Sequence, residues 1–141
     1  MSQENVEIVR RYFAEWNEGD IAAGRDWDPD IVWEEATAFP DHVVVRGRAA
    51  VIERLRERAR VIGRMLITVE ALTPVGQDGV LAELEVRGSG QASGVELSRN
   101  WFQIATVRDG LITGMQEFAT KDKALEARAC RSKRARADSN L

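Results

Sequence analysis

The sequence predicts an α+β fold in which helices come first and a curved antiparallel sheet then wraps around them. Three observations predict it. Apolar residues recur at helical spacing near the N-terminus and again over 49–62. Runs of alternating apolar residues then follow, separated by turns rich in Gly. The last of these runs, over 100–119, holds an Asp-Gly turn between two long alternating segments.

The first helix is predicted to begin at Ser2, a suitable N-cap, and to end at Asn17-Glu18-Gly19. Asp20 caps a second, short helix that runs through Trp27, and Asp28-Pro29-Asp30 breaks the chain after it. The apolar stripe of the first helix consists of Val6, Ile8, Val9, Tyr12, Phe13 and Trp16.

One strand and one long helix follow. The strand is predicted over Ile31 to Glu35, and the segment 36–48 is a loop or an irregular edge. The segment 49–62 is predicted to be an amphipathic helix with charged residues on its remaining faces. Its apolar stripe consists of Val51, Ile52, Leu55, Ala59 and Ile62.

Four successive strands complete the sheet, beginning with Met65 to Thr73 and Val80 to Arg87. In the second of these, apolar residues alternate with polar ones, which predicts one buried and one solvated face. Thr120 is placed to cap a last helix after the final strand.

The segment 100–119 is the most informative part of the chain. If Asp109-Gly110 forms a two-residue turn, then Arg108 pairs with Leu111 and the other pairs follow by counting. One face is then Trp101, Gln103, Ala105, Val107, Ile112, Gly114, Gln116 and Phe118. The other is Asn100, Phe102, Ile104, Thr113, Met115 and Glu117. Glu117 is therefore expected on an apolar face, beside Met115 and Phe102.

Composition narrows the possible functions. A chain of 141 residues with a net charge of −3 gives no reason to expect nucleic-acid or membrane binding. One cysteine excludes an intrachain disulfide, and one histidine makes a zinc site unexpected. The start of the chain is acidic and polar rather than a signal peptide, so we expect a cytoplasmic protein.

The domain is predicted to cover residues 1–127, followed by a basic tail over 128–141. That tail is either a solvated, flexible terminus or an arm for nucleic acid or an acidic partner.

Four segments in this order resemble the SnoaL-like polyketide cyclases of the nuclear transport factor 2-like superfamily. They are SQENVEIVRRYFAEWNEGD, DPDIVWEE, VRGRAAVIERL and VRDGLITGMQEF. The resemblance implies a cone-shaped, cystatin-like α+β barrel with an internal pocket, usually in a homodimer formed through the outer sheet face. On the family pattern Met115 and Glu117 point inward, and the dimer contacts are Trp101, Val107, Ile112 and Phe118.

The resemblance also implies that Glu117 is a general acid/base. Family members often carry a histidine two residues earlier, where this chain has Met115, and another histidine where it has Asp28. A carboxyl group in an apolar pocket has a raised pKa and can exchange protons near neutral pH. Alternatively, Glu117 lies at a solvated strand end or pairs with an arginine.

Two further catalytic candidates are Glu35, on the Trp33 face of its strand, and His42, in a loop expected near the pocket mouth. Both are equally compatible with simple exposure. The candidate ligand-binding residues are Tyr12, Trp16, Trp33, Asn100, Phe102 and Met115. Aromatic residues among them would also serve as ordinary core.

Two functions follow. The first is a cofactor-independent isomerase, cyclase or epoxide-hydrolase-like enzyme that acts on a small hydrophobic cyclic molecule, with neither metal nor cofactor. The second is a ligand-binding or dimerisation module of the same fold without catalysis.

Overall fold

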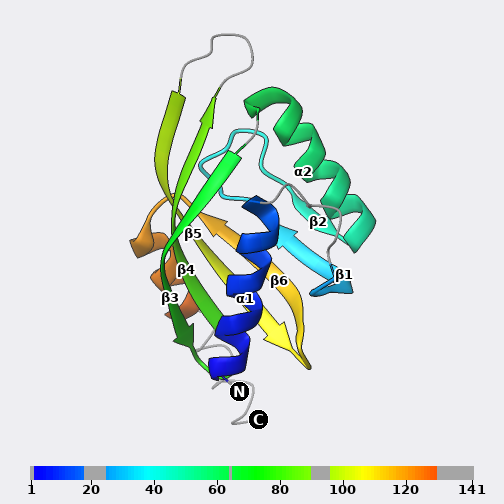
Figure 1. Ribbon diagram of the computed structural model, residues 1–141, viewed down its shortest axis with the longest axis vertical. Coiled ribbons are helices and arrows are strands. Elements are labelled where there is room, and N and C mark those ends of the chain that lie inside the picture. Colours follow the sequence, from blue (N-terminus) through cyan, green and yellow to red (C-terminus); the bar gives the residue numbers. More distant parts are fainter. Residues whose placement is uncertain (1, 18–24, 64, 90–95, 130–141) are drawn as a thin grey trace.

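The computed structural model describes residues 2–17, 25–63, 65–89 and 96–129. It confirms the α+β fold (Figure 1). Its elements are α1 (Ser2–Asn17), β1 (Trp27–Glu34), β2 (Val44–Arg46), α2 (Arg48–Ile62), β3 (Met65–Val75), β4 (Gly79–Ser89), β5 (Glu96–Arg108) and β6 (Leu111–Phe118). Residues 121–129 form a further helix. None of the helices in these ranges has the length and apolar character needed to cross a membrane.

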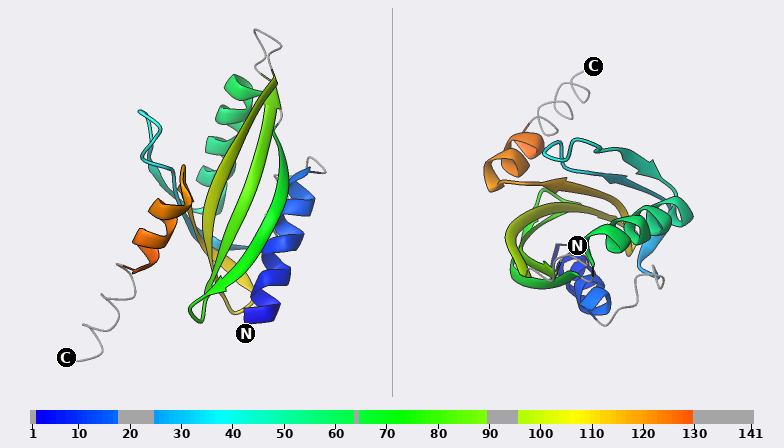
Figure 2. Two further views of the ribbon diagram at one scale, coloured as in Figure 1. Left: turned by 90° about the vertical axis from the view of Figure 1, so that its left-hand side faces the viewer. Right: turned by 90° about the horizontal axis from the view of Figure 1, so that it is seen from above.

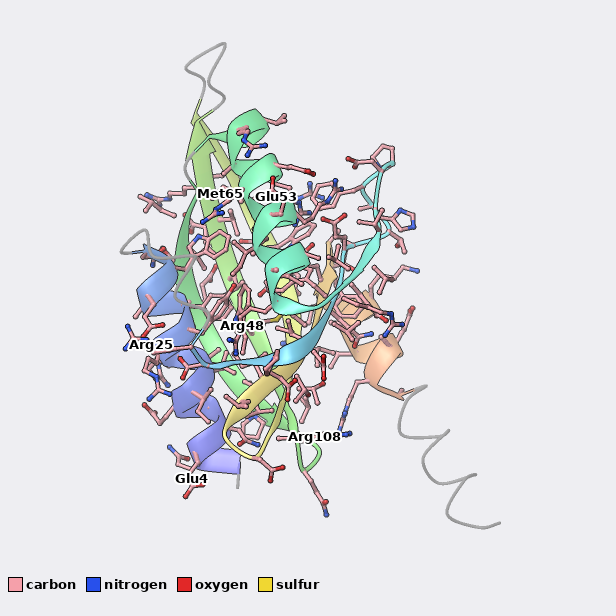
Figure 3. All side chains as sticks on the ribbon, turned by 90° about the vertical axis from the view of Figure 1, so that its right-hand side faces the viewer. Glu4, Arg25, Arg48, Glu53, Met65 and Arg108 are labelled. Atoms are coloured by element: carbon pink, nitrogen blue, oxygen red, sulfur yellow. The ribbon has the colours of Figure 1, made fainter. Side chains whose placement is uncertain are left out.

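The six strands form one curved, unclosed sheet in the order β2-β1-β6-β5-β4-β3. Its concave side curls around α1, which packs on β3 and β4, while α2 packs on β1 and β2 (Figure 2). Aromatic and aliphatic side chains of both helices and the sheet form one core. In Figure 3 side chains crowd the region between the two helices and the sheet.

Strand β1 differs from the prediction both in where it begins and in how it pairs with its neighbour. It begins at Trp27 and passes through Pro29, so the predicted helix does not reach Trp27; residues 18–24 lie outside the described ranges. Pro29 is tolerated because the β1–β6 register shifts between Trp27 and Val32, and a bulge needs no N–H donor there. The β1–β6 pair is parallel, the other pairs antiparallel, because no hairpin joins these two strands.

Strand β2 lies within the segment predicted to be a loop. It has three residues and pairs with β1 at the edge of the sheet. So short a strand carries no readable alternation, which is why the sequence did not indicate it.

The β5–β6 hairpin has the predicted turn but a different register. Asp109 and Gly110 both have positive φ, at 52° and 79°, as a type I′ turn requires. Arg108 pairs with Leu111 as predicted, but Thr106 pairs with Gly114, which leaves Thr113 as an extra residue. The bulge allows Ile112 and Met115 to be buried on the same side, with exposed fractions of 0% and 1%.

This slip of one residue exchanges the predicted faces of β5. Gln103 lies opposite Glu117, and Ala105 lies opposite Met115. Trp101 and Gln103 therefore share the inner face with Glu117, while Asn100 and Phe102 belong to the outer face. The prediction that placed Asn100 and Phe102 beside Glu117 was wrong for this reason.

The outer face is covered in part by the chain itself. The helix at 121–129 lies against it (Figure 2), and its buried Ala124 packs with Leu81 and Ile104. Lys123 donates its backbone N–H to the Thr120 hydroxyl at 3.2 Å, the cap predicted for this helix. Arg128, where the tail was predicted to begin, lies at the end of the same helix, 3.9 Å from Asp78.

The predicted dimer contacts are also changed by the register. Trp101, Val107 and Ile112 are buried in the inner core, and only Phe118 of the four lies in the outer cluster. The homodimer itself stays a prediction.

Candidate active site

A cavity of about 220 Å³ lies between the two helices and the inner face of the sheet. This volume is somewhat below the usual range for small-molecule sites, about 300–1,000 Å³, and would suit a small ligand. Most of its lining is apolar or aromatic. The lining residues are Tyr12, Trp16, Trp33, Phe39, Leu55, Arg58, Met65, Ile67, Val86, Gly88, Arg99, Trp101, Gln103 and Glu117.

Glu117, at the end of β6, is a buried carboxylate on the cavity wall. Arg58 of α2 donates from one guanidinium nitrogen to both of its oxygens, at 3.1 Å each. Gln103 donates through Nε2 to Glu117 Oε2 at 3.4 Å. Glu117 is thus held between a cation from one helix and an amide from the neighbouring strand.

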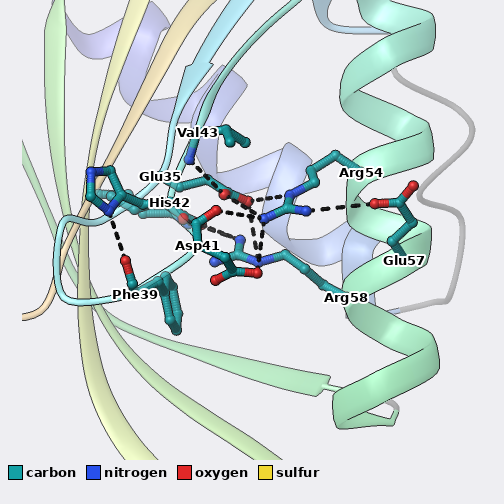
Figure 4. A network of polar contacts seen from close by, with 10 residues as sticks. Glu35, Phe39, Asp41, His42, Val43, Arg54, Glu57 and Arg58 are labelled. Carbon is teal, nitrogen blue, oxygen red and sulfur yellow. Dashed lines mark hydrogen bonds and ion pairs between the residues drawn. The ribbon is translucent and has the colours of Figure 1, made fainter.

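A second carboxylate shares the same arginine. Arg58 Nε lies 3.4 Å from Glu35 Oε2, and Arg54, one helical turn earlier, donates to both Glu35 oxygens at 2.9 Å (Figure 4). The backbone N–H of Val43 adds a further hydrogen bond to Glu35 at 3.1 Å. The two glutamates and two arginines form a chain of alternating charges, Arg54–Glu35–Arg58–Glu117.

The two carboxylates of this chain differ in pKa. Burial raises the pKa of Glu117; Arg58 opposes this effect, whereas the charge of Glu35 adds to it. Burial also acts to raise the pKa of Glu35, but hydrogen bonds and charges from Arg54 and Arg58 outweigh it, so that pKa is lowered. Glu35 therefore stays charged under conditions in which Glu117 binds a proton more readily.

Three polar groups on the cavity wall complete the site. Burial, with a smaller effect of Glu117, raises the pKa of Tyr12, so its hydroxyl stays neutral. Gln103 Oε1 and Trp33 Nε1 are buried without a hydrogen-bond partner among the described residues. The Trp33 indole N–H acts to lower the pKa of Glu117, but its effect is smaller than that of burial.

The structure brings some of the predicted site residues together and separates others. Four of them line the cavity: Tyr12, Trp16, Trp33 and Glu117. Glu35 is buried behind Arg58, and Met115 is in the core, so neither lines the cavity.

The other three predicted residues lie elsewhere. Asn100 is exposed on the outer face, and Phe102 packs in the outer cluster. His42 is exposed in its loop, where a ring nitrogen lies 2.7 Å from the Phe39 carbonyl oxygen. None of the three is among the lining residues.

Sequence reasoning missed Arg58, which it counted among the surface charges of the 49–62 helix. A signal was present: Arg58 follows Leu55 by three residues and precedes Ile62 by four, so it lies within the apolar stripe. A charge in that position needs buried partners, and Glu35 and Glu117 supply them. Gln103 and Arg99 were missed because the assumed register placed them on the other face.

The fold of this chain belongs to the NTF2-like α+β class, which it shares with solved structures. An NTF2-like protein of unknown function from Burkholderia pseudomallei K96243 is 13% identical, with a TM-score of 0.74 over 87% of this chain and 95% of that one. TerC, co-crystallised with polyporic acid, is 20% identical, with a TM-score of 0.74 over 89% of this chain and 98% of that one.

Within that class, the profile of the SnoaL-like domain matches residues 9–115, so the chain belongs to this family. A proposed SnoaL-like polyketide cyclase from Jannaschia sp. CCS1 has the same fold. It is 22% identical, with a TM-score of 0.72 over 89% of this chain and 90% of that one. No curated protein sequence matches the chain.

Proposed function

We propose that this protein binds a small hydrophobic cyclic molecule and acts on it by proton transfer, as a cofactor-independent isomerase, cyclase or hydrolase. One observation carries the proposal. Glu117 lies on the wall of an apolar cavity, and burial raises its pKa towards the range in which a carboxyl group can accept and return a proton.

In the proposed reaction the Glu117 carboxylate removes a proton from a ligand carbon next to a carbonyl group. The electron pair of the C–H bond moves to the carbonyl oxygen, and the carboxylic acid then returns its proton to another ligand atom. Tyr12 is a neutral hydroxyl on the same wall that can donate to the negative oxygen. Arg58 and Gln103 position Glu117, and Glu35 keeps Arg58 in place.

A second candidate function is ligand binding without catalysis. Arg58 engages both oxygens of Glu117, and Met115 replaces the histidine often found in catalytic members of the family. Both features favour a pocket whose carboxylate is structural.

The two candidates are separated by proton exchange on the bicyclic ketone 2-tetralone in D₂O, followed by NMR. The catalytic proposal expects the wild-type protein to accelerate exchange next to the carbonyl, and Glu117→Gln to reduce it by about 100-fold or more. Binding of tetralone, measured by calorimetry, should persist in the variant. Glu34→Gln removes the same charge outside the cavity, where Glu34 bonds to Gln116, and should leave exchange unchanged.

Two other outcomes of these exchange and binding measurements would contradict the catalytic proposal. Binding without accelerated exchange would assign the second function. If neither tetralone nor polyporic acid, with which TerC was co-crystallised, binds at all, the proposed pocket function is wrong.

A further inference from the structure

The cavity wall along β5 becomes more buried from one end to the other, with an exposed cation at the outer end and a buried carboxylate at the inner end. Alternation places Arg99, Trp101 and Gln103 on the same inner face, and all three line the cavity. Arg99 is exposed, whereas Trp101 and Gln103 are 6% and 5% exposed. Arg99 therefore marks the mouth of the cavity, and Gln103, opposite Glu117, marks its inner end.

The two arginines of the cavity differ in what neutralises them. Arg58 lies within 3.4 Å of Glu35 and 3.1 Å of Glu117, so its charge is balanced. Arg99 pairs with no acidic group among the described residues. Its guanidinium instead lies 5.0 Å from the centroid of the Trp101 ring. The Trp101 ring therefore holds the Arg99 guanidinium in position, and no acidic side chain in the part of the chain that the structure describes neutralises its charge, so it can pair with an anionic group of a ligand.

An aromatic wall joins the two arginines. The rings of Trp101 and Phe39 are 5.3 Å apart between centroids, and Arg58 lies 4.6 Å from the Phe39 ring. All of these groups line the cavity, so a flat ring entering it meets aromatic faces between the mouth and Glu117.

The charges of the cavity also determine which end of an anionic ligand faces inward. An anionic group at the inner end would lie beside Glu117 and near Glu35, and low-dielectric surroundings strengthen that repulsion. At the mouth the same group meets Arg99. Arg99 and Gln103 are four residues apart on one strand, so their Cα atoms are about 13 Å apart. The side chains extend into the cavity and reduce the distance between their polar ends. A body of one or two rings fits between them.

We propose that the natural ligand is an organic anion, with an apolar ring body directed at Glu117 and a carboxylate or equally acidic group bound by Arg99 at the mouth. This inference rests on the proposed ligand-binding function of the cavity. It makes Arg99 the residue that selects acidic ligands over neutral ones.

The test compares 2-naphthoate with its neutral counterpart, 2-naphthamide, by calorimetry at pH 7.5. Wild type should bind naphthoate about fivefold more tightly than naphthamide, since the ion pair is partly solvated. Arg99→Gln should remove this preference by weakening naphthoate alone, and Arg99→Lys should retain part of it because the charge remains. Added salt should weaken naphthoate binding and leave naphthamide binding unchanged.

Arg46→Gln is the matched control. Arg46 is exposed on the edge strand β2 and does not line the cavity, so this variant changes the net charge equally. It should keep the full preference for naphthoate, and thermal unfolding should show that each variant is folded.

The results separate this inference from the function on which it rests. Equal affinity of wild type for the two probes, or an unchanged preference in a folded Arg99→Gln variant, would overturn the role of Arg99. Equal loss in the Arg46 and Arg99 variants would show only a general effect of charge and would equally overturn it. Absence of binding by both probes would count against the pocket function itself.

Discussion

Glu35 and Glu117 contact the same guanidinium, but their pKa values are shifted in opposite directions. Glu35 has Arg54, Arg58 and a backbone N–H around it, and its pKa is lowered. Glu117 has one shared arginine, the Gln103 amide and an apolar cavity around it, and its pKa is raised. The second arginine and the backbone N–H around Glu35 outweigh the effect of burial, whereas the donors around Glu117 do not. Only the under-supplied carboxyl group is suited to proton transfer.

The largest expected effect comes from removing the shared cation. Arg58→Met keeps the length of the side chain but leaves two carboxylates without it, and Arg58 is only 13% exposed. We expect a loss of about 3–5 kcal/mol in the free energy of unfolding, measured in urea. The control Arg60→Met, with its side chain 67% exposed, should change stability by no more than about 1 kcal/mol. Similar losses in both variants would contradict the buried role of Arg58.

Neutralising Glu35, the carboxylate with more donors, should lower the free energy of unfolding by a smaller amount. Glu35→Gln leaves Arg54 and Arg58 with weaker acceptors, and we expect a loss of about 1–3 kcal/mol in urea unfolding. Because the charge of Glu35 raises the pKa of Glu117, that pKa should fall in the variant. Carboxyl ¹³C NMR measures the shift. Glu57→Gln, which alters a half-exposed partner of Arg54, should leave the pKa of Glu117 in place.

The two carboxylates should also give opposite pH dependences of stability. The raised pKa of Glu117 means that its contribution is fully present below the ordinary value of 4.5 and is lost as the pH rises through the folded-state pKa. The lowered pKa of Glu35 means that its contribution is present above 4.5 and is lost as the pH falls.

Unfolding of wild type, Glu117→Gln and Glu35→Gln across the acid range measures these dependences. The difference between wild type and Glu117→Gln should shrink as the pH rises above 4.5, and the difference for Glu35→Gln should shrink as it falls below 4.5. Slopes of the same sign would show that the two groups do not differ as described.

The smallest effect is expected at the exposed end of the charge chain. Asp41 lies 3.4 Å from Arg54, but its side chain is 78% exposed. Asp41→Asn should therefore change the free energy of unfolding by no more than about 0.5 kcal/mol. A larger loss would mean that the loop charge, and not only the buried donors, keeps Glu35 ionised.

The candidate site was predicted only in part from sequence, and the reason lies in the register of one hairpin. Glu117 and the helix aromatic residues Tyr12 and Trp16 could be found because a strand face and a helical stripe are local patterns. Gln103 and Arg99 could not, since one extra residue at Thr113 changes which β5 side chains meet β6.

Local sequence was enough to predict the order of most elements, the amphipathic 49–62 helix and the Asp109-Gly110 turn, since each depends on neighbouring residues and their allowed dihedral angles. Three features could be known only from the folded chain: the parallel β1–β6 pair, the bulge and the inward direction of Arg58. Their physical reason is non-local. Burying Ile112 with Met115 favours the bulge, and Arg58 is tolerated inside because Glu35 and Glu117 approach it from distant parts of the chain.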